Sequence, residues 1–411
     1  MLRLCVVTVA ASALAIAGTP ATAPTFTKDV APILFKSCVE CHRPTMFAPM
    51  SLMNYDEVRP WARAIKEKVV RRTMPPWDAE GPVGQFKNDP RLSQAEIDKI
   101  AAWVDAGAPK GADKDLPPTP TFKTVGWTIG KPDVVFSMAT EFHIPAEGTV
   151  PYLNFRVPTN LTEDKWIEAY EFRPSNRAQV HHIVANIVPP NAGPGALSEA
   201  MGGLGNLVPS RPGVVLPAGV AKFLPKGSDI ILQMHYTTNG VASTDRTEVG
   251  LIFAKEPPKW VVGSAGVTNL TFVIPPNDPN YEVRTKRKLT EDTVVRAYMP
   301  HMHVRGKDMI ILAHYVDGRT QTLLSVPHYD FNWQTTYELV KPEVLPKGTE
   351  LEVIAHYDNS ARNPNNPDPL HEVRWGDQTW EEMMIAAIES VRDRNAPPPQ
   401  MPTRTGAGGG Q

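Results

Sequence analysis

Two patterns of apolar and polar residues divide this chain, and the first of them is helical. Ile97, Ile100 and Val104 repeat at the spacing of one helix face. Ser93 and Glu96 precede them in the order of a capping box, which satisfies free backbone N–H groups at a helix start. We therefore predict a helix that begins at this capping box.

A second helix is predicted from Pro60 to Arg72, with Trp61, Ile65 and Val69 on one face. Together with the capped helix, it makes the whole segment from residue 24 to residue 112 helical in character.

From about residue 120 the pattern changes to short alternating or apolar runs, broken by Pro, Gly and Asn. Examples are Trp166–Phe172 and Ile230–Tyr236. Such runs are typical of strands in an antiparallel β-sandwich.

An internal repeat indicates that this β region has two related halves. The sequence Leu-Pro-Lys-Gly at residues 224–227 precedes His235 by the same interval as its copy at 345–348 precedes His356. We therefore predict two tandem, jelly-roll-like sandwiches.

The first residues of the chain have the pattern of a secretory signal peptide. Arg3 is followed by an apolar run from Leu4 to Ile16 and then by small residues, with possible cleavage after Ala17 or Ala23. The run is too short to span a bilayer. We expect a periplasmic or secreted product with no membrane span after cleavage.

Charge argues against nucleic acid as a partner. The 42 Lys and Arg nearly balance the 44 Asp and Glu, for a net charge of −2, and neither sign forms a long run.

Cysteine is rare, and its placement is informative. Cys5 lies in the predicted signal peptide, which leaves Cys38 and Cys41 as one close pair. With His42 they form C-x-x-C-H, in which two thiols add to the vinyl groups of a haem and the histidine binds its iron. The sequence therefore predicts a covalent c-type haem and no structural disulfide.

A methionine is expected as the second axial ligand of this haem. Met74 stands in Thr-Met-Pro-Pro-Trp, where the prolines hold the chain extended and allow the thioether to point inward. Met46, Met50 and Met53 are alternatives.

Residues 25–110 resemble small cytochrome c domains. The shared features are the opening Phe26–Val30, the C-x-x-C-H sequence and the final helix containing Trp103, all in family order. The resemblance implies an all-α fold around one haem.

A second group of possible ligands lies in the β region. It consists of adjacent His181 and His182, of His235 before a Tyr, and of His301 and His303. Residues two apart in a strand face the same side, so the last two can bind one ion. The adjacent pair can share an ion only where the strand bends or bulges.

The order of these histidines, followed by Glu-Glu-Met, resembles the copper type II, ascorbate-dependent monooxygenases, the family of the peptidylglycine and dopamine hydroxylating enzymes. The segments 329–334 and 375–383 add to the resemblance, which covers roughly residues 120–392. It implies two facing sandwiches, two copper ions, and hydroxylation of a substrate C–H bond with dioxygen.

Carried over residue by residue, the resemblance assigns two ligand sets. The electron-transfer copper would be held by His181, His182 and His235, and the copper that meets dioxygen by His301, His303 and Met383. A thioether suits copper(I), and two histidines with a weak third ligand leave room for oxygen.

Several alternatives remain open. Met384 competes with Met383, and His356 competes through the internal repeat. The positions that align with a carboxylate-binding Arg and a substrate-contacting Tyr of the peptide-amidating enzyme hold Met299 and Ala387, so peptide amidation is not expected.

The expected activity is oxidation of a small organic molecule with dioxygen. Electrons would come from an ascorbate-like reductant or a redox protein, and would pass through the fused haem, whose tether raises its local concentration. The alternatives are a noncatalytic electron carrier or copper-binding redox module, and an interaction protein whose sandwiches present loops.

The predicted organisation is thus multidomain: a small all-α cytochrome c domain followed by two tandem antiparallel β-sandwich domains. Its segments are a signal peptide (1–23), the cytochrome c domain (24–112), a linker (113–120), two monooxygenase-like sandwiches (121–256 and 257–394) and a disordered tail (395–411).

Overall fold

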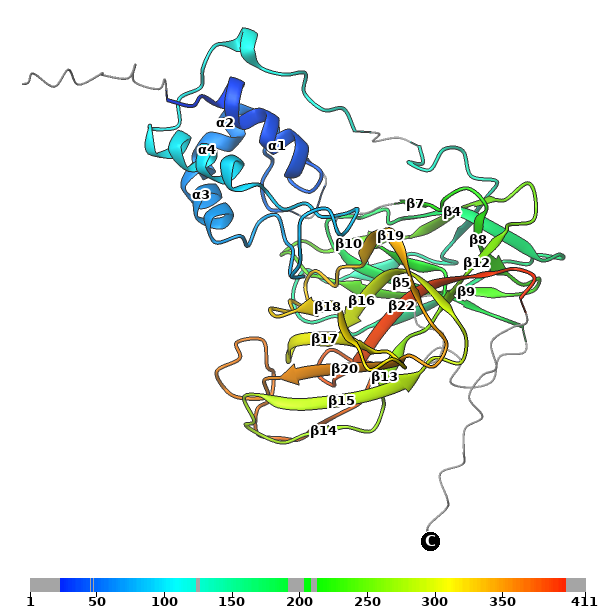
Figure 1. The fold of residues 1–411 in the computed structure, drawn as a ribbon. Helices are drawn as coiled ribbons and strands as arrows, with labels where there is room; N and C mark the ends of the chain where they lie inside the picture. The colour runs from blue at the N-terminus through cyan, green and yellow to red at the C-terminus, as the bar shows by residue number, and fades with distance from the viewer. Residues whose placement is uncertain are drawn as a thin grey trace, which may run out of the picture.

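The computed structural model describes residues 23–44, 46, 48–122, 126–190, 203–207 and 213–396 of the 411-residue chain. Almost all of the predicted signal peptide and tail lie outside these described residues. Helices occupy the first part of the described chain and strands the rest (Figure 1). None of the helices described is long and apolar enough to cross a bilayer.

The helical elements lie between residues 26 and 115. They are η1 (Phe26–Val30), α1 (Ala31–Ser37), α2 (Tyr55–Val58), η2 (Arg59–Trp61), α3 (Ala62–Val70), α4 (Gln94–Asp105) and η3 (Asp113–Asp115).

Helix α4 begins as its capping box predicts. The Ser93 hydroxyl accepts a hydrogen bond from the Glu96 backbone N–H, and the Glu96 carboxylate accepts one from the Ser93 N–H at 2.8 Å. The helix buries Ile100 and Trp103, and Gly107 follows it in the left-handed region at φ 87°.

Helix α3 is shorter than predicted, and one of its expected face residues is misplaced. Ile65 and Val69 are buried, but Trp61 is 43% exposed, so its predicted position on the buried face was wrong. The tryptophan belongs to η2, a 3₁₀ turn containing Pro60, and this turn changes the angular position of the residue relative to α3.

The helices share one apolar cluster that is separate from the clusters of the β region. It includes Phe26, Leu34, Leu52, Ile65 and Trp103. The helical segment therefore has a core of its own.

A ten-stranded sheet runs through the middle of the β region. Its main path is β1 (Val134–Ser137), β11 (Glu248–Phe253), β4 (Lys165–Arg173), β8 (Val220–Leu224), β12 (Trp260–Ser264), β22 (Met384–Asp393), β16 (Thr293–His301) and β19 (Tyr337–Leu345), while β7 (Gly213–Val215) pairs with β4 and β13 (Val267–Asn269) with β22.

Two four-stranded sheets accompany it. One has the order β3 (Leu153–Pro158), β9 (Asp229–Tyr236), β5 (Val180–Val188), β6 (Gly205–Leu207), and the other β15 (Tyr281–Lys288), β20 (Glu350–Tyr357), β17 (Gly306–His314), β18 (Thr320–Val326). Two short pairs join β2 (Phe142–Ile144) to β10 (Ser243–Asp245) and β14 (Val273–Ile274) to β21 (Val373–Arg374).

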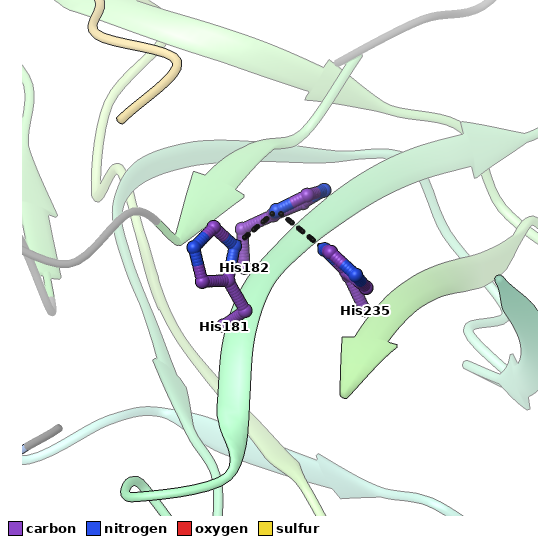
Figure 2. Close-up of side chains that lie close together, drawn as sticks. All are labelled: His181, His182 and His235. Atoms are coloured by element: carbon purple, nitrogen blue, oxygen red, sulfur yellow. Dashed lines mark hydrogen bonds between the residues drawn. The ribbon is translucent and has the colours of Figure 1, made fainter. Parts of the chain in front are cut away.

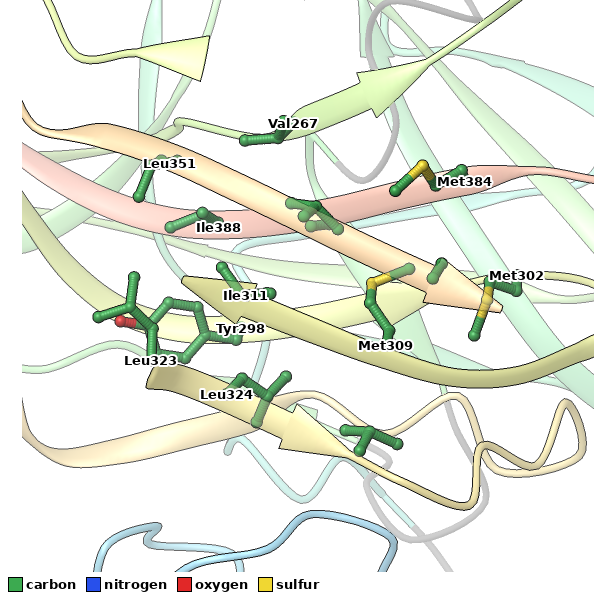
Figure 3. Packing of buried hydrophobic residues seen from close by; sticks show 14 of the residues in the cluster. Val267, Tyr298, Met302, Met309, Ile311, Leu323, Leu324, Leu351, Met384 and Ile388 are labelled. Atoms are coloured by element: carbon green, nitrogen blue, oxygen red, sulfur yellow. The ribbon is translucent and has the colours of Figure 1, made fainter. Parts of the chain in front are cut away.

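Each four-stranded sheet packs on one half of the ten-stranded sheet, which gives a mostly β protein of sandwich character. Figure 3 shows the second core, where Ile311 of one sheet and Ile388 of the other belong to the same buried cluster. In the first core, Leu232 and Leu251 do the same. Apolar side chains on facing sheets thus bury one another.

The two sandwiches are more closely joined than a tandem arrangement predicts. Strand β12 pairs in parallel with β8 of the first half and antiparallel with β22 of the second. The expected all-antiparallel pairing is therefore broken at this seam, which makes one continuous sheet.

The loop after α3 attaches the helical segment to the second sandwich. The Lys87 N–H donates to the Glu338 carbonyl at 2.7 Å, and the Val340 N–H donates to the Gln85 carbonyl at 3.0 Å. The Trp77 ring packs edge-on against Tyr337 at 4.9 Å between centroids. The loop that follows Met74 is thus paired with the edge strand β19.

Candidate metal centres

The C-x-x-C-H sequence forms a tight turn at the end of α1. The N–H groups of Cys41 and His42 both donate to the Cys38 carbonyl, at 3.2 and 2.9 Å. His42 Nδ1 lies 3.2 Å from the Met50 carbonyl oxygen, which suits an Nδ1–H donor and leaves Nε2 for a metal. Burial raises the pKa of the two free thiols to about 12 for Cys38 and about 11 for Cys41.

Met74 lines a cavity of about 420 Å³ between the helical core and the loop that follows α3. Val69 and Leu92 contribute apolar walls, and the cavity also contains Trp77, whose indole N–H is buried without a hydrogen-bond partner among the described residues. His42 is not among the lining residues, so this cavity by itself does not join the two expected axial ligands.

The other candidate methionines lie elsewhere in the helical segment. Met50 and Met53 pack against its core. The backbone carbonyl of Met50 is the group that faces His42 Nδ1. Met46 is half-buried in the same loop.

Three histidines of the first half meet at one point. His181 and His182 come from β5 and His235 from β9, and their candidate ligand atoms all lie within 4.8 Å of one another. Nδ1 of His182 is 3.0 Å from that of His181 and 3.4 Å from that of His235 (Figure 2). This is a suitable arrangement for one metal ion.

A strand irregularity makes this convergence possible. In the β5–β9 pair the register shifts between Val180 and His182. A bulge turns adjacent side chains out of strict alternation, so two neighbouring histidines can face one point. The bulge that the sequence requires for a shared ion is therefore present.

The three imidazoles are held neutral. Burial lowers the pKa of His181 to about 4, that of His235 to about 3, and that of His182 well below 6.5, and mutual repulsion between the rings contributes. Neutral imidazoles are the form that binds metals.

His301 and His303 form a second buried set at the end of β16. Their ring centroids are 5.2 Å apart, and the two residues are only 5% and 1% exposed. His301 Nδ1 lies 3.0 Å from Oε1 of Gln334, and His303 Nδ1 lies 3.2 Å from the Glu381 carbonyl. Both Nε2 atoms are thus left for a ligand. Burial lowers the two pKa values to about 4 and about 3.

Strand register distinguishes the two candidate methionines. His301 pairs with Ile385 across β16 and β22. Side chains of paired residues share a face and alternate along a strand, so Met383 extends the histidine face and Met384 points the other way. Met384 and Met302 both belong to the second apolar core (Figure 3). The structure therefore favours Met383 over Met384 as a possible ligand.

A buried carboxylate ties Met383 to the histidine strand. Glu382 is fully buried and accepts backbone hydrogen bonds from His303 and Arg305, each at 2.8 Å, and from Met383 at 3.2 Å. Its pKa is raised by burial to about 7. The Met383 carbonyl in turn accepts from the Tyr357 hydroxyl at 2.9 Å.

The internal repeat places His356 opposite His235 in sequence, but the surroundings of the two imidazoles differ. His356 occupies on β20 the place that His235 has on β9, but its Nδ1 lies 2.7 Å from Asp308 and its Nε2 3.5 Å from Glu282. It faces carboxylates rather than other imidazoles, so nothing in this arrangement favours it as a variant ligand.

Two aromatic rings separate the two histidine sets. Tyr152 lies 4.9 Å from His235 and 6.2 Å from His303, centroid to centroid. Phe331 lies 5.9 Å from His235 and 6.0 Å from His303. The Tyr152 distances limit the separation of these two imidazoles to about 11 Å.

Sequence reasoning gave these separating residues no role. Tyr152 lies alone just before β3, with no pattern around it that could have singled it out. Phe331 and Gln334 belong to the segment 329–334, whose signal in the sequence is its resemblance to the copper type II monooxygenases.

One arginine connects the C-x-x-C-H turn with the first histidine set. The positive charge of Arg177 opposes the rise in the pKa of Cys41 and contributes to the lowering of the pKa of His181. Its own pKa is lowered by burial to about 10. The turn and the three-histidine set are therefore neighbours across Arg177.

Comparisons with known proteins identify no family. No family model matches the chain, and no curated protein matches it. Among solved structures, the chain is similar to the major capsid protein P2 of bacteriophage PM2, at 6% identity and a TM-score of 0.28 over 64% of this chain and 98% of that chain. It is also similar to the VP2 subviral particle of infectious bursal disease virus, at 8% identity and a TM-score of 0.19 over 64% and 72%. Scores this low carry no inference about fold or function.

Proposed function

We propose that this protein is an exported, haem- and copper-dependent oxidoreductase that hydroxylates a C–H bond of a small organic substrate with dioxygen. The observation that carries the proposal is the pair of buried, neutral histidine sets that face a common aromatic layer from two sheets. The histidines follow one another in the sequence order of the copper type II monooxygenases, and their grouping into two sets supports the two-copper arrangement that this resemblance implies.

The donor atoms suit copper at both places. Three nitrogens converge in the first set, and two Nε2 atoms with the thioether of Met383 on the same face are available in the second. Imidazole and thioether are ligands that copper accepts in both its oxidation states. Bound there, copper would supply one-electron redox chemistry and a binding position for dioxygen.

The residues around these donors have definable tasks. Gln334 and the Glu381 carbonyl fix the ring orientation of the second pair through hydrogen bonds to Nδ1. Glu382 holds the backbone of His303 and Met383 in register. Tyr152 and Phe331 keep water away from the rings between the two sets.

The haem would enter this scheme as the local electron donor. Cys38, Cys41 and His42 fit covalent attachment, because His42 keeps Nε2 free while its Nδ1 meets a carbonyl. The charge of Arg177 acts on both Cys41 and His181, and this proximity supports electron entry at the three-histidine set. An ascorbate-like reductant or a redox protein would then reduce the haem.

The first test is metal analysis with electron paramagnetic resonance on the mature protein, produced in a host that matures c-type cytochromes. We expect one haem and two type II coppers in the wild type, with one copper signal lost in His301→Ala and altered in Met383→Ala. Met384→Ala is the matched control and should keep both signals. Haem without copper in the wild type would overturn the proposal.

A second test addresses electron flow. Haem reduced by dithionite should be reoxidised when copper and oxygen are both present, and should stay reduced when either is missing. Reduced haem that is insensitive to copper would contradict haem as the donor.

A noncatalytic electron carrier is the second candidate, and one observation favours it. His182, His301 and His303 are nearly inaccessible, at 4%, 5% and 1% exposure, so a substrate needs a movement to reach them. Oxygen uptake separates the two candidates, because a carrier binds copper and accepts electrons without consuming oxygen beyond one round of reoxidation.

A further inference from the structure

A continuous series of contacts runs from one histidine set to the other. His301 Nδ1 lies 3.0 Å from Oε1 of Gln334. The Nε2 of the same Gln334 amide and the Tyr152 hydroxyl are both buried, and neither makes a well-aligned hydrogen bond among the described residues. The two groups are neighbours, because the Gln334 amide acts on the Tyr152 hydroxyl and opposes the rise in its pKa.

Tyr152 completes the series on the other side. Its ring meets His235 at 4.9 Å and His182 at 5.7 Å, both edge-on. The residue is 8% exposed, and its backbone N–H donates to the Gln378 side chain at 3.2 Å. The backbone hydrogen bond and the edge-on ring contacts limit the positions that the Tyr152 ring can take.

We propose that Tyr152 and Gln334 form the bridge by which an electron crosses from the His181, His182 and His235 set to the His301, His303 and Met383 set. This inference rests on the proposed function and goes further, because it assigns the crossing to Tyr152 and Gln334 in addition to the shielding and orienting tasks given to them above. Tyr152 and Gln334 are positioning residues in this scheme, since they act through the ligands.

The step leaves the bridge chemically unchanged. With copper bound at both sets, one electron would pass from copper(I) at the first set to copper(II), formed by reaction with dioxygen, at the second, and no bond of Tyr152 or Gln334, the O–H bond included, would form or break.

Two neighbouring aromatic residues fit the bridge less well. Phe331 also contacts His182, His235 and His303, but it has no polar group that could reach His301. The Tyr329 hydroxyl accepts from the Met302 N–H and donates to the Met302 carbonyl, so it is already engaged with the backbone. Only Tyr152 combines ring contact with a polar group facing Gln334.

The test uses the full-length protein loaded with two copper(I) ions and mixed with oxygen in the absence of substrate. In this reaction two copper(I), one dioxygen and two protons give two copper(II) and one hydrogen peroxide. Freeze-quench electron paramagnetic resonance follows copper(II) with time, and the peroxide is counted separately.

In the wild type, both coppers should be oxidised in one phase. In Tyr152→Leu, the copper of the three-histidine set should oxidise at least about tenfold more slowly, as a separate phase. Tyr152→Phe keeps the ring and loses the link to Gln334, so it should fall between the two. Tyr298→Phe removes a buried hydroxyl that contacts Glu343 rather than a histidine, and it should behave as wild type.

The outcomes separate the bridge from the proposed function. Single-phase oxidation at the wild-type rate in Tyr152→Leu and Tyr152→Phe, with both coppers bound, would overturn the bridge alone. If Tyr152→Leu loses a copper, the isosteric Tyr152→Phe decides. A wild type that binds no copper would overturn both the bridge and the proposed function.

Discussion

The two histidine sets differ in what surrounds their nitrogens. In the first, Nδ1 of His182 faces Nδ1 of His181 and Nδ1 of His235, and both of these contacts are between imidazoles. In the second, His301 and His303 have Nδ1 directed at oxygen acceptors. In the first set the imidazoles therefore contact one another through Nδ1, whereas in the second each imidazole is oriented by a hydrogen bond to a neighbouring oxygen.

This difference assigns different properties to the sets. A ligand group whose rings are fixed by external hydrogen bonds keeps its geometry when a coordination position is open or exchanged. The rings of the three-histidine set instead contact one another and the aromatic residues Tyr152 and Phe331. The first set is thus suited to a permanently bound ion and the second to a reactive one.

Acid is expected to cause the largest change in the free energy of unfolding of the metal-free protein, and this change involves the histidines of both sets. The unfolded chain protonates its histidines below about pH 6.5, whereas His181, His235, His301 and His303 take up protons only near pH 3 to 4, and the pKa of His182 also lies well below 6.5. Their contribution to stability is therefore present above pH 6.5 and is lost as the pH falls through this window. Glu382 and Asp78, with pKa values raised to about 7, act in the opposite direction.

Because five groups oppose two, the net result should be a loss of several kcal/mol between pH 7 and pH 4. Urea unfolding at a series of pH values measures it. His235→Gln should flatten the dependence, since it removes one of the five. A free energy of unfolding that does not change over this range would contradict the buried, neutral state of both sets.

The sequence predicted much of the fold because its signals are local. The capping box of Ser93 and Glu96 and the alternating runs around β4 and β9 depend only on neighbouring residues, and these elements formed where expected. The parallel pairing of β8 with β12 depends on how two halves meet, which no local pattern records. Trp61 was misplaced because a 3₁₀ turn and an α-helix share a similar spacing of apolar residues.

The same distinction applies to the site. The histidines could be singled out because adjacent and alternate pairs are visible in the sequence, and the bulge at His182 followed from the chemistry of sharing an ion. Tyr152 could not, because its meaning comes from contacts with residues far along the chain. The assignment of haem, copper and activity to these residues stays a prediction.

Removal of the Glu382 carboxylate should have the next largest effect, and it is confined to the second set. Glu382→Ala leaves three backbone N–H groups without their acceptor and removes the larger of the two opposite charges that act on the buried Arg305, the other being Asp368. Loss of a buried charged partner costs about 3–5 kcal/mol. Urea unfolding should show this loss.

Glu381→Ala is the matched control, because that side chain accepts a single backbone hydrogen bond, from Gln378, and is less buried. It should cost far less. Equal losses in the two variants would mean that the second set is not fixed by Glu382, and would weaken the contrast between the sets.

A smaller effect is expected from the thioether of the second set. Met383→Leu keeps the volume of the side chain and removes the sulfur, so copper(I) affinity at this set should fall at least about tenfold, or about 1.4 kcal/mol. Met384→Leu, in the apolar core, should leave the affinity unchanged. Competition with a copper(I) chelator measures both. The reverse pattern would exchange the roles of the two methionines and refute the register argument.

The smallest effect is expected at His356, where the comparison between the halves is most direct. This residue has the repeat position of His235, yet its ring nitrogens face Asp308 and Glu282, and it is partly exposed. Partly exposed ion pairs contribute about 0–1 kcal/mol, so His356→Gln should change stability by no more than this. Copper content, measured beside His235→Gln, should stay at the wild-type value in His356→Gln and fall by one ion in His235→Gln. If both variants lost an ion, the two halves would use the same strand position as a ligand. The contrast between a set whose imidazoles contact one another and a set oriented by hydrogen bonds to oxygen would then have to be abandoned.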